Sequence, residues 1–200
     1  MNNFNRDNSA WCITDGSAGM ISQVKGLAQA MNLEFTLKEV KVNFPWNILP
    51  VGVIPIVKST FSNFSEFSEN IPPKFLISCG RKSIYLSLFL KRKYKEKVVT
   101  IHIQNPKSKY DEFDLIISPK HDNLNLANSF VTSLAINHIS ETLISEEMDK
   151  FSYLVNSDDT PICAVLIGGQ SNNYIFDNNE VDKLIKKIKK IKENQKIKFF

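Results

Sequence analysis

The chain contains few cysteines and histidines, three of each in 200 residues. Cys12, Cys79 and Cys163 lie far apart and lack the spacing of zinc ligands, and the histidines and acidic residues lack it too. Each cysteine falls within or at the end of a predicted strand, which indicates reduced, buried thiols and is typical of a cytoplasmic protein. We therefore expect no metal site and a cytoplasmic location.

Long hydrophobic runs are also absent. The longest apolar region, residues 44–57, contains three prolines and is shorter than the ~20 residues that a membrane-spanning helix needs. The first ten residues have no apolar segment of the kind found in secretory signals. The net charge of +4 is too small by itself to indicate nucleic-acid binding. We expect a soluble protein with no transmembrane segment and no nucleic-acid partner.

Three common catalytic and nucleotide-binding motifs are missing from the sequence. There is no G-x-G-x-x-G fingerprint, which disfavours a nicotinamide cofactor, and no G-x-x-x-x-G-K-[ST] phosphate-binding loop. A G-x-S-x-G elbow is also absent, which disfavours a serine hydrolase. No tightly bound cofactor is expected.

Strand and helix patterns alternate through most of the chain. The predicted strands cover residues 10–14, 35–42, 74–79, 97–103 and 113–119. The predicted helices cover residues near 17–31, from the segment 80–83 to Leu90, and near 135–154, with short helices and loops before Pro73. This alternation predicts an α/β fold with a mostly parallel, Rossmann-like sheet covered on both faces. Ligands of such sheets bind at the carboxyl ends of the strands, where the polar motifs of this chain also fall.

A second strand–helix–strand pattern follows a polar break at residues 155–161. A strand runs into the glycine turn of "ICAVLIGGQS", and residues 178–194 form an amphipathic helix before a last strand in "KIKFF". One such unit cannot bury both faces of its sheet. We therefore expect an acceptor-side domain over 1–155 and the incomplete start of a second Rossmann-like domain over 156–200. The lysines opposite the apolar stripe fit a solvated helix face, with peripheral membrane contact as the alternative.

The first polar cluster is "TDGSAG", between the first strand and the first helix. Its glycines let the backbone approach a ligand, and the free amides of the helix's first turn attract anions. Asp15 would repel a phosphate, so it caps the helix, binds a hydroxyl or acts as a base. The competing interpretation is a structural turn with an Asp or Ser cap. The candidate ligand-binding residues here are Thr14, Gly16, Ser17, Gly19 and Gln23.

The second cluster, Gly80-Arg81-Lys82-Ser83, follows the strand that ends at Cys79. Two cations at a helix N-terminus oppose the helix dipole, so an anion nearby would compensate them. A phosphate-bearing ligand is one candidate for that anion, and Asp15 is the other. Gly80, Arg81 and Lys82 are therefore predicted ligand-binding residues.

Histidines follow two further strands. His102 lies within "HIQNP" and is predicted to be a satisfied core residue, whereas His121 lies in a loop beside Asp122. A histidine with an acidic neighbour near a strand end can supply general acid–base chemistry. His121 is therefore predicted to be catalytic, as is Asp15.

Five motifs occur in one order between Trp11 and Phe176. They are W-x-I-T-D-G-x-A-G-x-x-x-Q-x-x-G-L-A-x-A, "ISCGRKS", "HIQNP", "FDLIISPKHD" and "AVLIGGQSNNYIF". Together they resemble the mitochondrial-fission-type family of glycosyltransferase-like proteins, found in bacteria and plants. The chain is similar to a bacterial-type member, because it shows no added segment for the dynamin-related partner linked to the plant relatives.

The resemblance implies a GT-B-like architecture, in which the first of two Rossmann-like domains holds the acceptor and the second the nucleotide-sugar donor. It also implies members longer than this chain, so that the chain is expected to be truncated. It would place Gly168, Gly169 and Ser171 near the donor's diphosphate. Two positions depart from the family pattern. Asn105 stands where an acidic residue is expected, and no glycine follows Asp122.

Two functions from different classes follow from these residues. The first is metal-independent glycosyl transfer from a nucleotide sugar to an unknown acceptor, with Asp15 or His121 as the base and Arg81 near the leaving diphosphate. The second is a non-catalytic scaffold that keeps the cleft to bind a nucleotide or a partner protein. An epimerase is disfavoured because it would need a nicotinamide cofactor.

Overall fold

The computed structural model describes residues 6–69, 71–155, 160–168 and 175–200. The chain forms two compact units, Met1–Ile139 and Ser140–Phe200. The predicted domain boundary follows residue 155, whereas the two units divide after Ile139. The two divisions differ mainly in the placement of helix α3 (Glu141–Val155), which belongs to the second unit. The domain limits of the protein stay a prediction.

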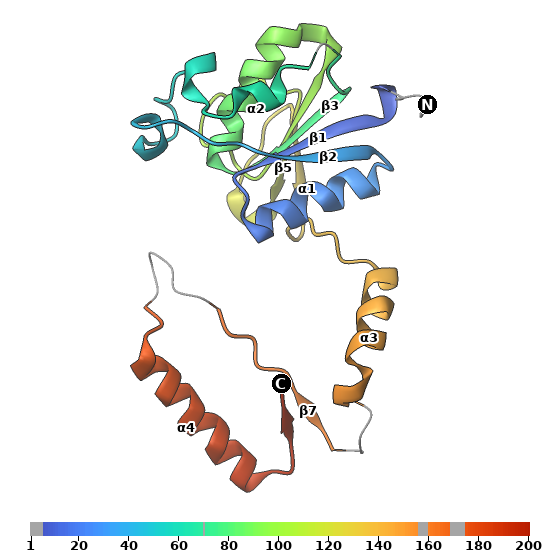
Figure 1. The fold of residues 1–200 in the computed structure, drawn as a ribbon, viewed down its shortest axis with the longest axis vertical. Coiled ribbons are helices and arrows are strands. Elements are labelled where there is room, and N and C mark those ends of the chain that lie inside the picture. The colour runs from blue at the N-terminus through green and yellow to red at the C-terminus, as the bar shows by residue number, and fades with distance from the viewer. Residues whose placement is uncertain (1–5, 70, 156–159, 169–174) are drawn as a thin grey trace. The chain divides into compact units, whose positions relative to one another are not determined.

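A six-stranded sheet forms the centre of the first unit, and all its strands are parallel (Figure 1). The strand order is β2-β1-β3-β4-β5-β6, so the predicted α/β, Rossmann-like parallel sheet is confirmed. The strands are β1 (Ser9–Thr14), β2 (Glu34–Glu39), β3 (Phe75–Cys79), β4 (Val99–Ile103), β5 (Leu115–Pro119) and β6 (Ser129–Thr132). The sequence did not predict β6, and β2 ends earlier than residue 42.

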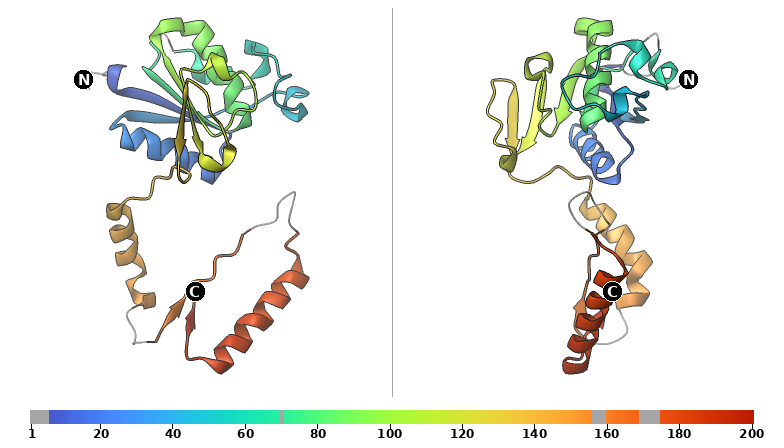
Figure 2. Two further views of the ribbon diagram at one scale, coloured as in Figure 1. Left: turned by 180° about the vertical axis from the view of Figure 1, so that it is seen from behind. Right: turned by 90° about the vertical axis from the view of Figure 1, so that its left-hand side faces the viewer.

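One helix covers each face of this sheet (Figures 1 and 2). Alternate side chains of a strand point to opposite faces. Cys12 therefore packs with Val24 of α1 (Ala18–Ala30), whereas Ile13 packs with Ile84 of α2 (Arg81–Tyr94). The central strands β1, β3, β4 and β5 are largely buried, which agrees with their continuous apolar sequences.

The segment between β2 and β3 consists of loops with three short 3₁₀ turns, as predicted. The turns are η2 (Trp46–Ile48), η3 (Lys58–Thr60) and η4 (Phe64–Phe67). Phe61, Phe64 and Phe67 anchor the segment in the core on the α2 face. The Gly52 amide donates a hydrogen bond of 2.5 Å to Tyr85 Oη on α2. These contacts hold the neighbouring Val51 beside the carboxyl ends of the strands.

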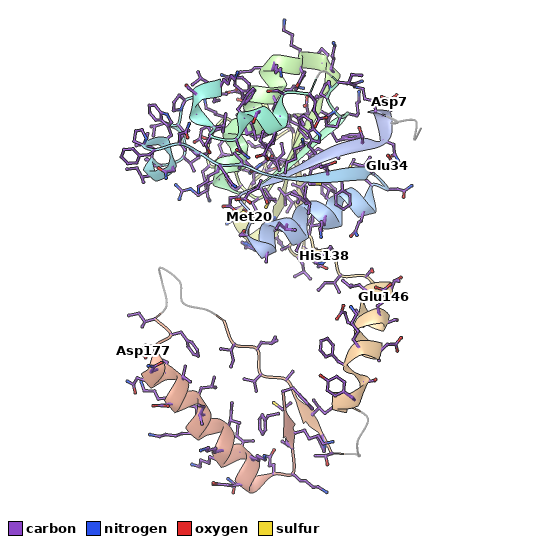
Figure 3. All side chains as sticks on the ribbon, viewed as in Figure 1. Asp7, Met20, Glu34, His138, Glu146 and Asp177 are labelled. Carbon is purple, nitrogen blue, oxygen red and sulfur yellow. The ribbon has the colours of Figure 1, made fainter. Side chains whose placement is uncertain are left out.

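The chain that follows β6 packs back onto α1. Ser22 Oγ and His138 Nδ1 are 2.8 Å apart, and a Cβ at Gly26 would overlap the carbonyl of Asn137 (Figure 3). These contacts hold residues before Ile139 in an extended path. The helix predicted near 135–154 therefore begins only at Glu141.

The second unit contains the predicted second strand–helix–strand pattern. β7 (Ile162–Cys163) and β8 (Lys198–Phe199) pair in parallel, and α4 (Asn178–Asn194) connects them. Asp177 caps α4 by accepting a 3.0 Å hydrogen bond from the Glu180 amide (Figure 3). The helix limits agree with the sequence prediction, whereas β7 is much shorter than predicted. Among the described residues, no helix is long and apolar enough to cross a membrane.

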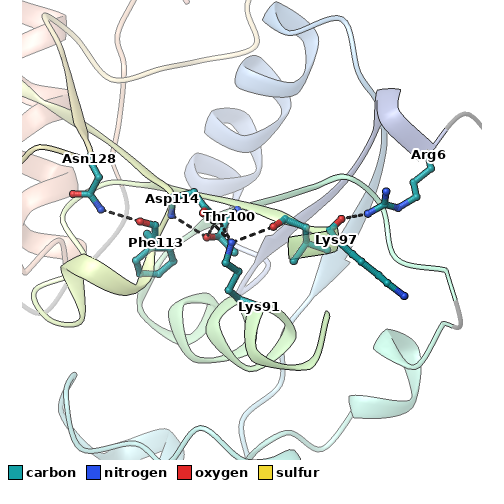
Figure 4. Close-up of polar contacts among 8 residues, drawn as sticks. Arg6, Lys91, Lys97, Thr100, Phe113, Asp114 and Asn128 are labelled. Atoms are coloured by element: carbon teal, nitrogen blue, oxygen red, sulfur yellow. Dashed lines mark hydrogen bonds and ion pairs between the residues drawn. The ribbon is translucent and has the colours of Figure 1, made fainter. Parts of the chain in front are cut away.

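Polar side chains are closely paired where β4 and β5 begin (Figure 4). Asp114 accepts hydrogen bonds from Lys91 Nζ at 2.7 Å, from the Thr100 amide at 2.7 Å and from Thr100 Oγ1 at 2.8 Å. Burial alone would raise the pKa of Asp114, but these hydrogen bonds and the Lys91 charge hold it below its ordinary value. Asp114 thus ties α2, β4 and β5 together.

Candidate functional site

The glycine turn after β1 is built by two side chains that bond to its backbone. Thr14 Oγ1 accepts a 3.1 Å hydrogen bond from the Gly16 amide, and Asp15 Oδ1 accepts one of 3.3 Å from the Ser17 amide. Gly16 has a φ of +90°, which favours glycine. Ser17 precedes α1 without a side-chain cap, so the first amides of the helix are not satisfied in that way. The turn is exposed at Gly16, Ser17 and Gly19.

A second glycine turn, at Gly80 on the adjacent strand β3, lies against the first. Gly80 has a φ of +98°, and a Cβ there would overlap Met20 Sδ of α1 and lie 3.8 Å from Asp15 Oδ2. Burial, and then the charge of Asp15, raise the pKa of the Cys79 thiol to about 12. The Asp15 carboxylate is therefore held at the carboxyl ends of β1 and β3.

Two hollows open at this edge of the sheet. The first hollow, of about 500 Å³, has polar side chains in its lining that include Gln23, Arg81, His102, Gln104, Lys107 and His121. The second hollow, of about 240 Å³, is lined by residues that include Asp15, Met20, Asn47, Arg81 and Lys82. Arg81 lines both hollows, so the two are neighbours within the first unit.

Cations in the hollows lack protein partners. The side chains of Arg81, Lys82 and Lys107 make no hydrogen bond or ion pair with any described residue. Arg81 and Lys82 also occupy the first turn of α2, where positive charge opposes the helix dipole. Asp15 forms no ion pair with Arg81 or Lys82, so the interpretation that its carboxylate neutralises these two cations is not supported. An anionic ligand remains the other candidate for the compensating charge.

The two predicted bases lie in different hollows. Asp15 lines the second hollow and His121 the first, and the His121 side chain is 79% exposed. His121 Nε2 is 3.9 Å from Asp122 Oδ1, and Asp122 Oδ2 accepts a 3.2 Å hydrogen bond from the Asn105 amide. Asp15 has backbone support for its orientation, whereas His121 is held only by this weak pairing.

Asn105, which departs from the family pattern, has a structural role. Its Oδ1 accepts hydrogen bonds from the Lys107 amide at 2.8 Å and from Tyr110 Oη at 3.2 Å. Both bonds need an acceptor oxygen, which a carboxylate can supply as well as an amide. The departure therefore leaves the loop at the rim of the first hollow intact.

His102 is buried, as predicted, but it also lines the first hollow. Its Nδ1 lies 2.9 Å from Ser78 Oγ on β3, and its ring packs on Phe113 with centroids 5.1 Å apart. Burial lowers the pKa of His102 to about 3, so the ring is neutral at physiological pH. The prediction that His102 is a core residue is thus correct, but the sequence did not show that this residue also lines a hollow.

The remaining predicted residues are not all brought to one place. Gln23 and Gly80 line the first hollow, and Thr14 supports the first turn from a buried position. Gly168 is exposed in the second unit, and Gly169 and Ser171 lie outside the described residues. Among the described residues, no cluster of three or more His, Cys, Asp or Glu side chains could hold a metal ion.

The sequence prediction missed Gln104 and Lys107 as lining residues. Both have positive φ values, +83° for Gln104 and +61° for Lys107, which is uncommon outside glycine. A signal was present, because both residues follow the strand that carries the "HIQNP" motif. The local backbone that turns them toward the hollow was not readable from residue types.

Comparison with known proteins identifies the family. The model of the family described as "Mitochondrial fission ELM1" matches residues 18–200, which is most of the chain, and the chain belongs to this family. The match begins at the first residue of α1, so Thr14 and Asp15 lie just before it.

Two relatives are longer than this chain, and the match covers only part of each. It is 29% identical over 116 residues to an uncharacterized protein of Rickettsia prowazekii, covering 56% of this chain and 32% of that protein. It is 31% identical over 71 residues to the mitochondrial fission protein ELM1 of Arabidopsis thaliana, covering 36% of this chain and 15% of that protein. The chain thus spans about a third or less of these relatives. No solved structure matches it.

Proposed function

We propose that this member of the mitochondrial fission ELM1 family transfers a glycosyl group from a nucleotide sugar to the hydroxyl of an acceptor, without a metal. The observation that carries the proposal is the edge where β1, β3, β4 and β5 end. There, an exposed glycine turn, a buried one at Gly80, cations without a partner among the described residues and a positioned carboxylate surround two adjoining hollows. Ligands of parallel α/β sheets bind at this edge.

Arg81 is the residue best placed to stabilise a leaving diphosphate. Its side chain has no partner among the described residues, and Arg81 lines both hollows and begins α2, whose first amides also favour anions. In transfer, the bond between the sugar's anomeric carbon and the phosphate oxygen breaks, and the diphosphate keeps the electron pair. Positive charge and amide groups aimed at that oxygen lower the barrier without a metal. Lys82 and Lys107 add positive charge nearby.

The base takes the proton of the acceptor hydroxyl as its oxygen bonds to the anomeric carbon. Asp15 is the first candidate, because the Ser17 amide orients its carboxylate toward a hollow that Arg81 also lines. His121 is the second candidate, because it lines the first hollow and histidine is a common general base. In this proposal Gly168, Gly169 and Ser171 bind the donor from the second domain of the longer protein.

Nucleotide release from a panel of nucleotide sugars tests the proposal. The protein is used as its cell makes it, and the panel contains uridine, guanosine, adenosine and thymidine diphosphate sugars. We expect Asp15→Asn to lower turnover by about 10²–10⁴-fold while nucleotide affinity is retained. His121→Asn gives that loss instead if His121 is the base.

Asp111→Asn is the matched control, since Asp111 is exposed in the same unit and lines neither hollow. It should leave turnover unchanged. Turnover that survives both Asp15→Asn and His121→Asn contradicts the assignment of the base. Absence of turnover with every donor contradicts glycosyl transfer and points to the scaffold role.

A further inference from the structure

His102 occupies an unusual position at the floor of the first hollow. It is 1% exposed, yet it lines the hollow together with Gln104 and Arg81. Nδ1 is engaged with Ser78 Oγ, and no described residue forms a hydrogen bond with Nε2. The hydrogen-bonding capacity of Nε2 is therefore available to a ligand or water in the hollow.

The contacts of Ser78 favour one tautomer of this imidazole. Ser78 Oγ lies 2.9 Å from His102 Nδ1 and 3.4 Å from the carbonyl oxygen of Ile101. A serine hydroxyl has one hydrogen, so both contacts are satisfied only if Nδ1–H donates to Oγ and Oγ–H donates to the carbonyl. In that arrangement Nε2 carries no proton and presents a lone pair.

The ring stays uncharged over the whole physiological range. Burial lowers the pKa of His102 to about 3. The charged and titratable groups that line the same hollow are Arg81, Lys107, His121 and Asp122. Such an imidazole is a poor proton acceptor in catalysis but a good hydrogen-bond acceptor.

We propose that His102 Nε2 accepts a hydrogen bond from a sugar-type hydroxyl group bound in the first hollow, with Ser78 as the positioning residue. A hydroxyl group combines a donor for Nε2 with acceptor lone pairs for the amide side chains of Gln23 and Gln104, and a sugar presents several hydroxyls side by side. This inference rests on the proposed function, because the hydroxyl is that of the acceptor. His102 orients the acceptor through this hydroxyl, and Asp15 or His121 takes the proton of another hydroxyl of the acceptor, the one that attacks the sugar donor.

The tautomer is tested on the protein without ligand. In ¹⁵N-histidine-labelled protein, two-bond proton–nitrogen spectra separate a protonated from an unprotonated Nε2. We expect His102 to keep an unprotonated Nε2 from pH 8 to pH 5. A protonated Nε2, or a titration in that range, overturns the proposal.

Two serine variants form a matched pair. Ser78→Ala should remove the tautomer preference of His102. Ser118→Ala should not, since Ser118 Oγ is buried on a neighbouring strand without a partner among the described residues. Equal spectra for the two variants contradict the positioning role of Ser78.

Ligand chemistry is tested with methyl glycosides of glucose, galactose, mannose and N-acetylglucosamine as probes. At least one should shift the His102 Nε2 resonance saturably and leave His138 unchanged, and His102→Phe should weaken its binding about tenfold. No saturable shift with any probe overturns the inference. The readout needs no turnover, so a protein that binds the probe through His102 but transfers nothing contradicts the proposed function alone.

Discussion

Polar side chains at the two ends of the six-stranded sheet differ in how they are paired. Where β4 and β5 begin, Asp114 accepts hydrogen bonds from Lys91 and Thr100, and Arg6 donates one to the carbonyl of Lys97 (Figure 4). Arg6 also donates to the carbonyl of Pro72. Where the strands end, Arg81 and Lys107 have no described partner. Paired groups stabilise the fold, whereas unpaired groups around a hollow are available to a ligand. The following predictions test this division.

Among residues at the strand ends, the largest expected effect on stability is at the junction of the two glycine turns. Gly80→Ala should cost about 1–3 kcal/mol, because it combines a positive φ with an overlap on Met20. Gly52→Ala is the matched control, since Gly52 also has a positive φ but open space around it. Denaturant unfolding of both variants measures the difference. Equal losses would contradict the close approach of the turns.

Asp114 should give the next largest effect. Asp114→Asn should cost about 1–2 kcal/mol, a figure reduced for solvent screening because the side chain is 38% exposed. The pKa of Asp114 is lower in the folded state, so its stabilisation is present above the ordinary pKa of 3.8 and is lost as pH falls below it. The free energy of unfolding should fall more steeply between pH 5 and pH 2 for the wild type than for Asp114→Asn. Parallel curves would contradict the role of this carboxylate.

Gly19 should give the smallest effect on stability, with the opposite sign. A Cβ there meets nothing within 4 Å, so Gly19→Ala should stabilise α1 by up to ~1 kcal/mol. Gly26→Ala should instead destabilise, since its Cβ meets the Asn137 carbonyl. If the first turn faces a ligand, Gly19→Ala also weakens nucleotide binding, which calorimetry can measure. Unchanged binding would remove Gly19 from the site.

The central strands and the βαβ order could be predicted from the sequence, because strands buried on both faces read as continuous apolar runs. The edge strand β6 could not, since Phe130 and Val131 are exposed and its four residues give no periodic signal. The start of α3 was predicted too early because the fit of Asn137 against Gly26 is a tertiary contact. Such contacts leave no local pattern.

The candidate site was predictable in its location but not in its connections. Strand ends identified Asp15, Arg81 and His121 as neighbours of one edge. That Asp15 and His121 lie in separate hollows joined by Arg81 depends on how the loops of Val51 and Gln104 pack. His102 was assigned to the core from its strand position, and the hollow beside it was not visible in the sequence.

Pyrophosphate binding tests the division between the two ends of the sheet most directly. Isothermal titration at low salt would compare the wild type with Arg81→Gln and Arg92→Gln, which change two arginines of the same helix. Arg92 is paired with Glu112 at 2.6 Å, whereas the Arg81 side chain has no partner in the described part of the chain. We predict about tenfold weaker binding for Arg81→Gln with unchanged thermal stability, and unchanged binding for Arg92→Gln. Equal affinities for all three proteins, or no binding by the wild type, would contradict the assignment of the strand ends as the anion-binding site.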